Sequence, residues 1–182
     1  MNRLDRNSAL LLIIDVQEKL MPVIDQHDEI TRNIDRMIRG CRILGVPAMI
    51  TEQYVKGLGS TIEPVRSALE SSYKPVEKNC FSAQGLAEFE SALRQSGRRQ
   101  ILVTGIETHV CVYQTVSDLL RAGYEVTLIA DALSSRTQQN KNIALRRMES
   151  DGAKISSTEM ALFELTKVSA TDEFRAISKL VK

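Results

Sequence analysis

The continuous apolar run Ala9-Leu10-Leu11-Leu12-Ile13-Ile14 constrains the fold more than any other stretch of the chain. A strand with one solvated face alternates apolar and polar residues, whereas an unbroken run of this length is typical of a central parallel strand covered on both faces. The run is too short to cross a membrane, ends at Asp15 and has no small-residue cleavage site after it. It therefore predicts a buried strand between two layers of helices.

Segments of strand length alternate with segments of helical periodicity along the rest of the chain. Further strands are predicted over residues 47–51, 73–78, 101–104, 125–130 and 154–157. The segment 73–78 is polar and contains Pro75, so we expect it at the edge of the sheet. The repeated alternation predicts a three-layer α/β/α, Rossmann-like fold with about six mainly parallel strands, in one domain spanning residues 1–182.

Charge and cysteine content limit the classes of partner. The 24 basic and 23 acidic residues are well mixed and leave a net charge of +1, which is not the basic face of a nucleic-acid-binding protein. The three cysteines, Cys41, Cys80 and Cys111, are an odd number without regular spacing, which argues for free thiols in a reducing compartment. We therefore expect a cytoplasmic protein with a small-molecule substrate and with no nucleic-acid or membrane partner.

The candidate nucleophile follows the apolar run 100–103. Thr104-Gly105 predicts a turn from this strand into a helix that carries Cys111 in its first turns. Because the N-terminus of a helix is electropositive, a thiol there is expected to be pushed toward thiolate. The alternative is that Cys111 is a small buried hydrophobe, as we expect for Cys41 on the apolar face of its helix.

Two charged residues could complete a site around this thiol. Asp15 directly follows the first strand, and ligands of open parallel sheets bind at the carboxyl ends of strands. If the strands ending at Asp15 and before Cys111 are neighbours, the carboxylate and the thiol meet; otherwise Asp15 could merely cap the next segment. Lys78 is less distinctive, but a lysine beside the thiol would lower the thiol pKa and keep the carboxylate ionised.

Other chemistries have weaker support. His109 lies two residues from Cys111, and such residues point to nearly opposite sides of a helix, so His109 is expected at the pocket rim and not as the base. Neither histidine belongs to a metal-ligand motif, and Gly57-x-Gly59 lacks the third glycine of a dinucleotide fingerprint. We therefore expect no metal and no cofactor.

The combined pattern resembles the isochorismatase-like cysteine hydrolases. The resemblance covers nearly the whole chain and is carried by Asp15-Val16-Gln17, by Lys78 with Phe81-Ser82 after it, and by the segment from Gly105 to Cys111-Val112. Two further segments, 51–61 and 131–136, are most similar to the isochorismatase-domain-containing subgroup. The resemblance implies a catalytic triad of Asp15, Lys78 and Cys111, and a homo-oligomer.

The resemblance also implies a backbone feature and a pocket. A cis peptide is expected between Ile106 and Glu107, and its expected use is to direct the N–H groups of Glu107 and Cys111 into one oxyanion hole. Substrate contacts are expected from Gln17, Gln53, Tyr54, Leu58, Phe81 and Thr108.

Departures from individual branches of the family narrow the expected reaction. The loop 52–57 lacks the Asp-x-His metal cluster of nicotinamidases. Isochorismatases, which cleave a vinyl ether, do not need the cysteine that this chain retains at position 111. The expected function is hydrolysis of a C–N bond in a small amide, ureide or carbamoyl compound through a thioester-type intermediate.

Two other classes of function stay open. The chain could be a small-molecule-binding or interaction protein that keeps the scaffold without turnover. Thiol redox chemistry is a third possibility, but no resolving cysteine is visible in the sequence, and pairing of Cys80 with Cys111 is a remote candidate.

Overall fold

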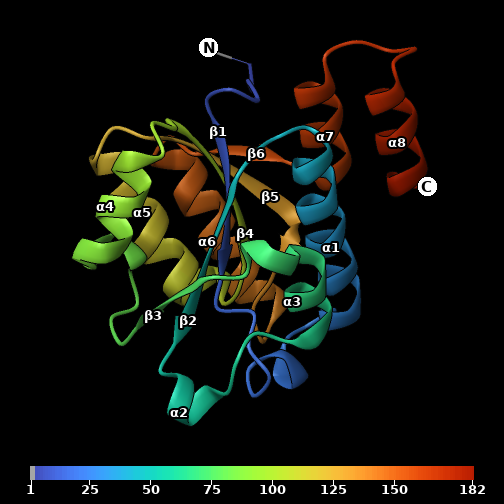
Figure 1. Ribbon diagram of the computed structural model, residues 1–182. Coiled ribbons are helices and arrows are strands. Elements are labelled where there is room, and N and C mark those ends of the chain that lie inside the picture. Colours follow the sequence, from blue (N-terminus) through green and yellow to red (C-terminus); the bar gives the residue numbers. More distant parts are fainter. Residues whose placement is uncertain (1–2) are drawn as a thin grey trace.

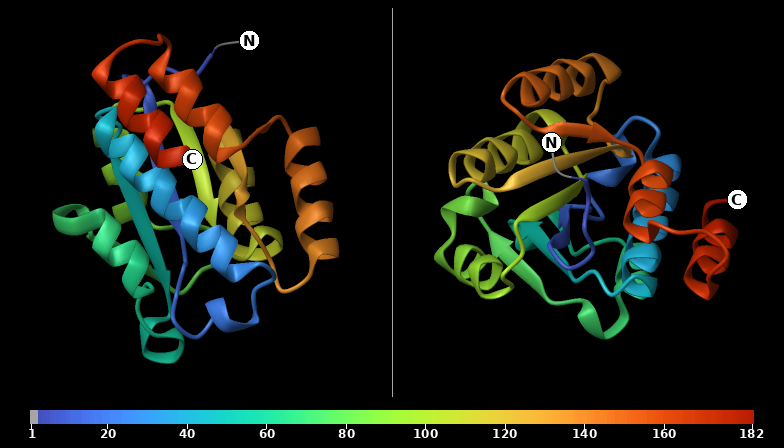
Figure 2. Two further views of the ribbon diagram at one scale, coloured as in Figure 1. Left: turned by 90° about the vertical axis from the view of Figure 1, so that its right-hand side faces the viewer. Right: turned by 90° about the horizontal axis from the view of Figure 1, so that it is seen from above.

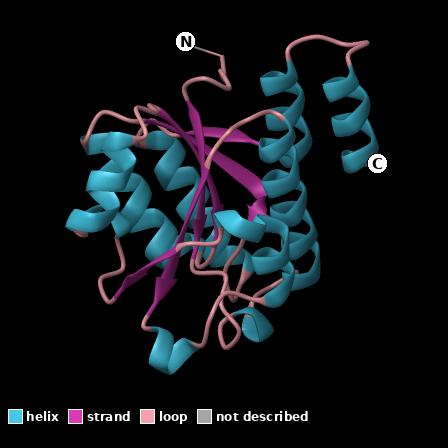
Figure 3. Ribbon diagram, in the orientation of Figure 1, coloured by secondary structure: helices cyan, strands magenta, loops and turns pink. Residues whose placement is uncertain are grey.

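The computed structural model describes residues 3–182 and contains one six-stranded sheet. Every adjacent pair of strands is parallel, and their order is β3-β2-β1-β4-β5-β6 (Figures 1 and 3). The strands are β1 (Ala9–Ile14), β2 (Ala48–Gln53), β3 (Pro75–Lys78), β4 (Gln100–Gly105), β5 (Glu125–Leu133) and β6 (Lys154–Ser156). The predicted parallel α/β fold is confirmed, with β3 at an edge.

Helices cover both faces of the sheet, which makes the three layers visible when the sheet is seen end-on (Figure 2). One face carries α1 (His27–Ile43), α3 (Glu63–Leu69) and α7 (Thr158–Thr166), with α8 (Asp172–Val181) packed outside α1 and α7. The other face carries α4 (Ala87–Gln95), α5 (Tyr113–Arg121) and α6 (Gln138–Ser150). The short helix α2 (Val55–Leu58) follows the carboxyl end of β2.

The side chains of β1 alternate between the two hydrophobic cores. Leu11 and Ile13 belong to the core beneath α1, whereas Leu10, Leu12 and Ile14 belong to the core beneath α4 and α5. All five are at most 1% exposed. Because both faces of the strand are covered, the sequence shows no alternation, and an uninterrupted apolar run results.

Strands β2 and β5 continue further at their carboxyl ends than predicted. β2 continues through Glu52 and Gln53, which were expected in a loop, and β5 continues past Asp131 to Leu133. Hydrophobicity could not indicate these extensions, since the added residues are mostly polar. Because β2 is extended, Gln53 is paired in register with Lys78 on β3.

No helix within residues 3–182 has the length and apolar character needed to cross a membrane.

Candidate active site

Asp15 lies at the point where the sheet reverses its winding. β1 has β2 on one side and β4 on the other, and the crevice beyond such a switch point is the usual ligand site of open α/β sheets. The backbone of Asp15 turns into the left-handed region, with φ 52°, and its N–H still donates to the carbonyl of Thr51 at 3.2 Å. Aspartate tolerates this conformation better than a branched residue would.

The Asp15 carboxylate is paired with Lys78, as the resemblance implied. Lys78 Nζ lies 2.6 Å from Asp15 Oδ2, and both side chains are 0% exposed. The hydroxyl of Thr51 donates to the other oxygen, Oδ1, at 2.8 Å. The strand order β3-β2-β1 brings the two charged residues to one edge although 63 positions separate them.

Cys111 approaches this ion pair from the end of β4. Gly105, with φ 115°, ends β4, and a Cβ there would come within 2.1 Å of the Ile14 carbonyl oxygen, so only glycine fits. The chain then forms one π-helical turn, Thr108–Val112, ahead of α5. Cys111 is 7% exposed on this turn and lies near enough to the Asp15 and Lys78 side chains for both to shift the pKa of its thiol.

The thiol of Cys111 is held protonated in the resting site. Burial is the largest cause that raises the pKa of Cys111, and the nearby Asp15 carboxylate acts in the same direction. The Lys78 ammonium lowers the pKa but only partly offsets both, and the net result is a pKa of about 12. The expectation that the helix N-terminus would favour the thiolate is therefore wrong, because desolvation of the charged form outweighs the dipole. A reaction at this thiol needs a base to remove its proton, and the Asp15 carboxylate is the acceptor in contact with it.

This protonation state has a measurable consequence. Alkylation of Cys111 by a small haloacetamide is expected to accelerate steadily above about pH 8.5, where an ordinary thiol is half ionised, and to show no plateau there. A Cys80→Ser variant removes the exposed thiol, and peptide mass spectrometry separates Cys111 from buried Cys41. A half-maximal rate at or below about pH 8.5 would contradict the raised pKa.

The turn between β4 and Cys111 has the expected cis peptide between Ile106 and Glu107. Among residues 3–182 the N–H of Glu107 has no hydrogen-bond acceptor, while the Glu107 carboxylate accepts from Arg136 at 3.0 Å. His109 Nδ1 lies 3.0 Å from the Ser135 hydroxyl, so its polar contact is with the segment after β5.

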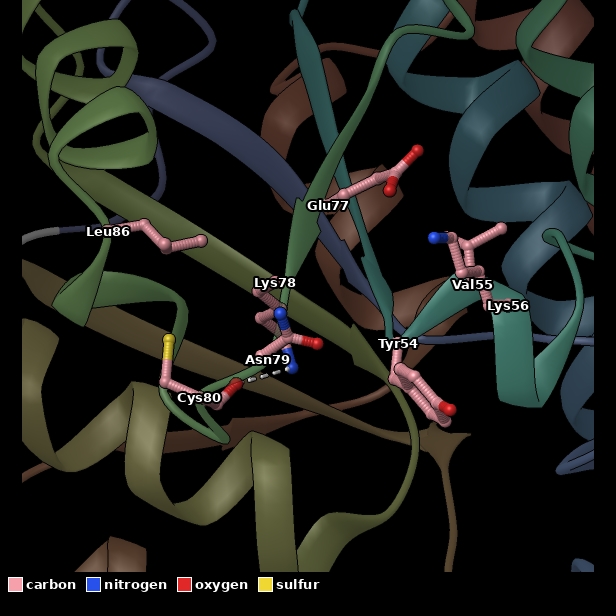
Figure 4. A pocket seen from close by; sticks show the side chains of 8 residues that line it. All are labelled: Tyr54, Val55, Lys56, Glu77, Lys78, Asn79, Cys80 and Leu86. Carbon is pink, nitrogen blue, oxygen red and sulfur yellow. Dashed lines mark hydrogen bonds between the residues drawn. The ribbon is translucent and has the colours of Figure 1, made fainter.

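A cavity of about 440 Å³ opens beside Lys78 (Figure 4). Its lining comes from the segment after β2, from β3 and from the loop that follows β3: Tyr54, Val55, Lys56, Glu77, Lys78, Asn79, Cys80 and Leu86. Of the six residues expected to contact substrate, only Tyr54 is in this lining. Its ring covers Gly57, where a Cβ would come within 2.1 Å of the ring.

The other expected contact residues lie elsewhere. Gln17 and Thr108 are 0% exposed, Phe81 projects outward at 51%, and neither Gln53 nor Leu58 lines the cavity. The Gln17 amide donates to the carbonyls of Gln53 and Gly59 and accepts from the Gln53 N–H, so its expected substrate contact does not fit this geometry. The Thr108 hydroxyl has no hydrogen-bond partner in the part of the chain that the structure describes.

Sequence reasoning missed two contributors to the site, Thr51 and Asn79, and left Cys80 open between the core and the pocket wall. Thr51 holds Asp15, whereas Asn79 and Cys80 line the cavity next to Lys78. Asn79 and Cys80 directly follow Lys78 in the sequence, and that proximity was the available signal.

All three cysteines are free thiols. Within residues 3–182 no group of three or more His, Cys, Asp or Glu side chains could hold a metal ion.

Fold and site together define an open parallel α/β protein with a buried acid–lysine pair beside a cysteine at the switch point of the sheet. The chain belongs to the isochorismatase family, since the sequence profile of the isochorismatase domain matches residues 9–160.

Individual relatives agree with this assignment. The secreted isochorismatase effector Isc1 of Phytophthora sojae is 38% identical over 100% of this chain and 88% of its own. Isochorismatase domain-containing protein 2 of Danio rerio is 37% identical over 98% of this chain and 89% of its own.

Solved structures share the fold over nearly the whole length. The structure of MAR1 ribonuclease from Caenorhabditis elegans matches with a TM-score of 0.92 and 34% identity over 99% of this chain and 92% of that one. The YcaC gene product of Escherichia coli, described as an octameric hydrolase of unknown specificity, has a TM-score of 0.92 and covers 99% of this chain and 89% of its own. At 21% identity it supports the fold alone.

Proposed function

We propose that the protein is a cysteine-dependent hydrolase that cleaves a C–N bond in a small amide, ureide or carbamoyl compound. The observation that carries this proposal is the fully buried Asp15–Lys78 ion pair, 2.6 Å long, beside the Cys111 thiol, whose pKa is raised by burial. Burying two charges often costs more free energy in desolvation than their attraction returns, and such groups cluster at functional sites, which favours a catalytic role for this pair.

In the proposed acylation step, Asp15 removes the proton from Cys111 Sγ as sulfur attacks the substrate carbonyl carbon. The negative charge that develops on the carbonyl oxygen is stabilised by the N–H groups of Glu107 and Cys111. The C–N bond then breaks, the leaving nitrogen takes the proton from Asp15, and a thioester on Cys111 remains. Lys78 stabilises the thiolate as it forms, and Asp15 is a carboxylate again once its proton has passed to the leaving nitrogen.

In the proposed deacylation step, Asp15 takes a proton from a water molecule that attacks the thioester carbonyl. The C–S bond breaks, the acid product leaves, and the proton returns from Asp15 to the Cys111 sulfur. Both half-reactions use the same base, so the carboxylate needs access to the leaving group and to water in turn.

An ammonia-release screen over small amides, ureides and carbamoyl compounds tests the proposed activity. At least one class should release ammonia or amine with the wild-type protein and none should do so with Cys111→Ala, because the variant lacks the attacking sulfur. A matched Cys41→Ala variant, which loses the other buried thiol, should keep the activity. Turnover that survives in Cys111→Ala would contradict the nucleophile.

A binding or interaction protein on the same scaffold is the other class of function. Slow alkylation of the resting thiol does not favour this alternative, because burial alone makes the thiol slow. Turnover in the screen decides between the two. The C. elegans protein is named a ribonuclease, and that activity is stated for that protein alone. The net charge of +1 on the present chain offers little attraction to RNA.

Three properties of the whole molecule accompany the proposal. We propose a homo-oligomer, and size-exclusion chromatography with light scattering would determine the number of subunits. We also propose a cytoplasmic location, in keeping with three free thiols. We further propose that residues 1–182 form a single isochorismatase-like domain.

A further inference from the structure

The end of β2 sends its side chains to two different places. Because side chains two apart on a strand face the same side, Thr51 and Gln53 both face the site, while Glu52 between them faces away. Thr51 donates to Asp15 at 2.8 Å, and Gln53 Oε1 accepts from Lys78 Nζ at 2.7 Å. Glu52 instead binds Thr61 and Tyr73 on the opposite face.

Among residues 3–182, Gln53 provides the only uncharged acceptor at short hydrogen-bond distance from the Lys78 ammonium. That ammonium has three N–H donors on a flexible four-carbon stem, so its direction depends on its acceptors. Its contacts are Asp15 Oδ2 at 2.6 Å, Gln53 Oε1 at 2.7 Å and the Cys80 carbonyl at 3.4 Å, the last drawn dashed in Figure 4. The third contact is long, so Asp15 and Gln53 set the position of the charge.

Gln53 is itself fixed by the amide of Gln17. The Gln53 N–H donates to Gln17 Oε1 at 2.7 Å, and Gln17 Nε2 donates back to the Gln53 carbonyl at 2.9 Å. The ladder between β1 and β2 ends at the pair Ile14–Thr51, because the chain turns at Asp15. The buried Gln17 side chain thus replaces the strand neighbour that β2 has lost.

The Gln53 side chain is held at its other end as well. Its Nε2 donates to the carbonyl of Asn79 at 2.9 Å, one residue beyond Lys78. The amide therefore bridges β2 to the chain segment that carries the ammonium, and its carbonyl oxygen can face only Lys78.

We infer that Gln53, held by Gln17, is a positioning residue that keeps the Lys78 ammonium beside the Cys111 thiol. The inference rests on the proposed function of the site. Without the Gln53 oxygen the buried positive charge loses its neutral acceptor, so it is less stabilised and less able to oppose the raised pKa of Cys111. The inferred role of Gln53 is thus to hold the Lys78 ammonium and not to bind substrate.

The test compares Gln53→Met with Glu52→Met. Both remove a hydrogen-bonding side chain from neighbouring positions of β2, but only Gln53 faces Lys78. Gln53→Met should slow alkylation of Cys111 by roughly tenfold, corresponding to one unit of thiol pKa, while Glu52→Met leaves the pH profile unchanged. Gln17→Met should shift the profile in the same direction by less, and serves if Gln53→Met fails to fold.

Steady-state kinetics on a substrate from the ammonia screen give the second readout. Gln53→Met should lower kcat with KM unchanged, since Gln53 does not line the cavity. A raised KM with an unshifted alkylation profile would overturn the inference and return Gln53 to substrate binding. Equal shifts of the alkylation profile in Gln53→Met and Glu52→Met would also overturn the inference, because they would indicate a general loosening of the structure around β2. The alkylation profile needs no substrate, so it stands or falls separately from the proposed hydrolysis.

Discussion

Lys78→Met is expected to destabilise the folded protein by about 3–5 kcal/mol, because it leaves the Asp15 carboxylate buried without its counter-charge. For a domain of this size the loss corresponds to a fall in the melting temperature of roughly 6–20 °C. Thermal unfolding by circular dichroism would measure it. The same variant should be inactive in the ammonia screen.

A double variant separates charge from packing. Asp15→Asn together with Lys78→Met removes both charges, so it should recover part of the lost stability and none of the activity. As a surface comparison, Lys167→Met breaks the exposed pair with Asp5 and should cost no more than about 1 kcal/mol. A loss in Lys78→Met as small as in Lys167→Met would show that the buried pair is not held as described.

Asp15→Asn is expected to move two properties of Cys111 in opposite directions. The Asp15 carboxylate raises the pKa of the Cys111 thiol, both by its charge and by its hydrogen bond. Its removal lowers that pKa and lets the thiolate become the counter-ion of Lys78, so alkylation near neutral pH should be at least about tenfold faster. Hydrolysis should nevertheless fall by about 10²–10⁴, because the base that moves the protons is gone.

Asp131→Asn is the matched control for this experiment. Asp131 lies on β5 and accepts hydrogen bonds from the N–H and hydroxyl of Thr158, away from the thiol. The same chemical change there should leave both alkylation and hydrolysis unchanged. If Asp15→Asn slows alkylation and hydrolysis together, the carboxylate is not what holds the thiol protonated.

Much of the fold could be predicted because its signals are local. The apolar run before Asp15, the glycine turn at Gly105 and the proline in the edge strand each act through their immediate neighbours. Strand ends were harder to predict, since Glu52 and Gln53 are polar residues that nevertheless continue β2 up to the site. A hydrophobic pattern cannot indicate an extension of that kind.

The candidate site could be predicted only in part from the sequence, for three physical reasons. An amide side chain can bind substrate or backbone equally well, so the use of Gln17 and Gln53 inside the protein depends on contacts between distant segments. The protonation state of Cys111 depends on burial, which outweighs the helix N-terminus and reverses the expected direction of its pKa. Lys78 could be assigned only through the family resemblance, since its place depends on strand order.

Mass spectrometry of a rapidly quenched reaction tests the central claim most directly. With an amide that the wild-type protein hydrolyses, the account predicts an acyl adduct on the peptide containing Cys111, present during turnover and gone once substrate is consumed. Neither Cys41 nor Cys80 should carry it. Continued turnover without any adduct on Cys111, or with the adduct on another residue, would contradict the assignment of Cys111 as the nucleophile.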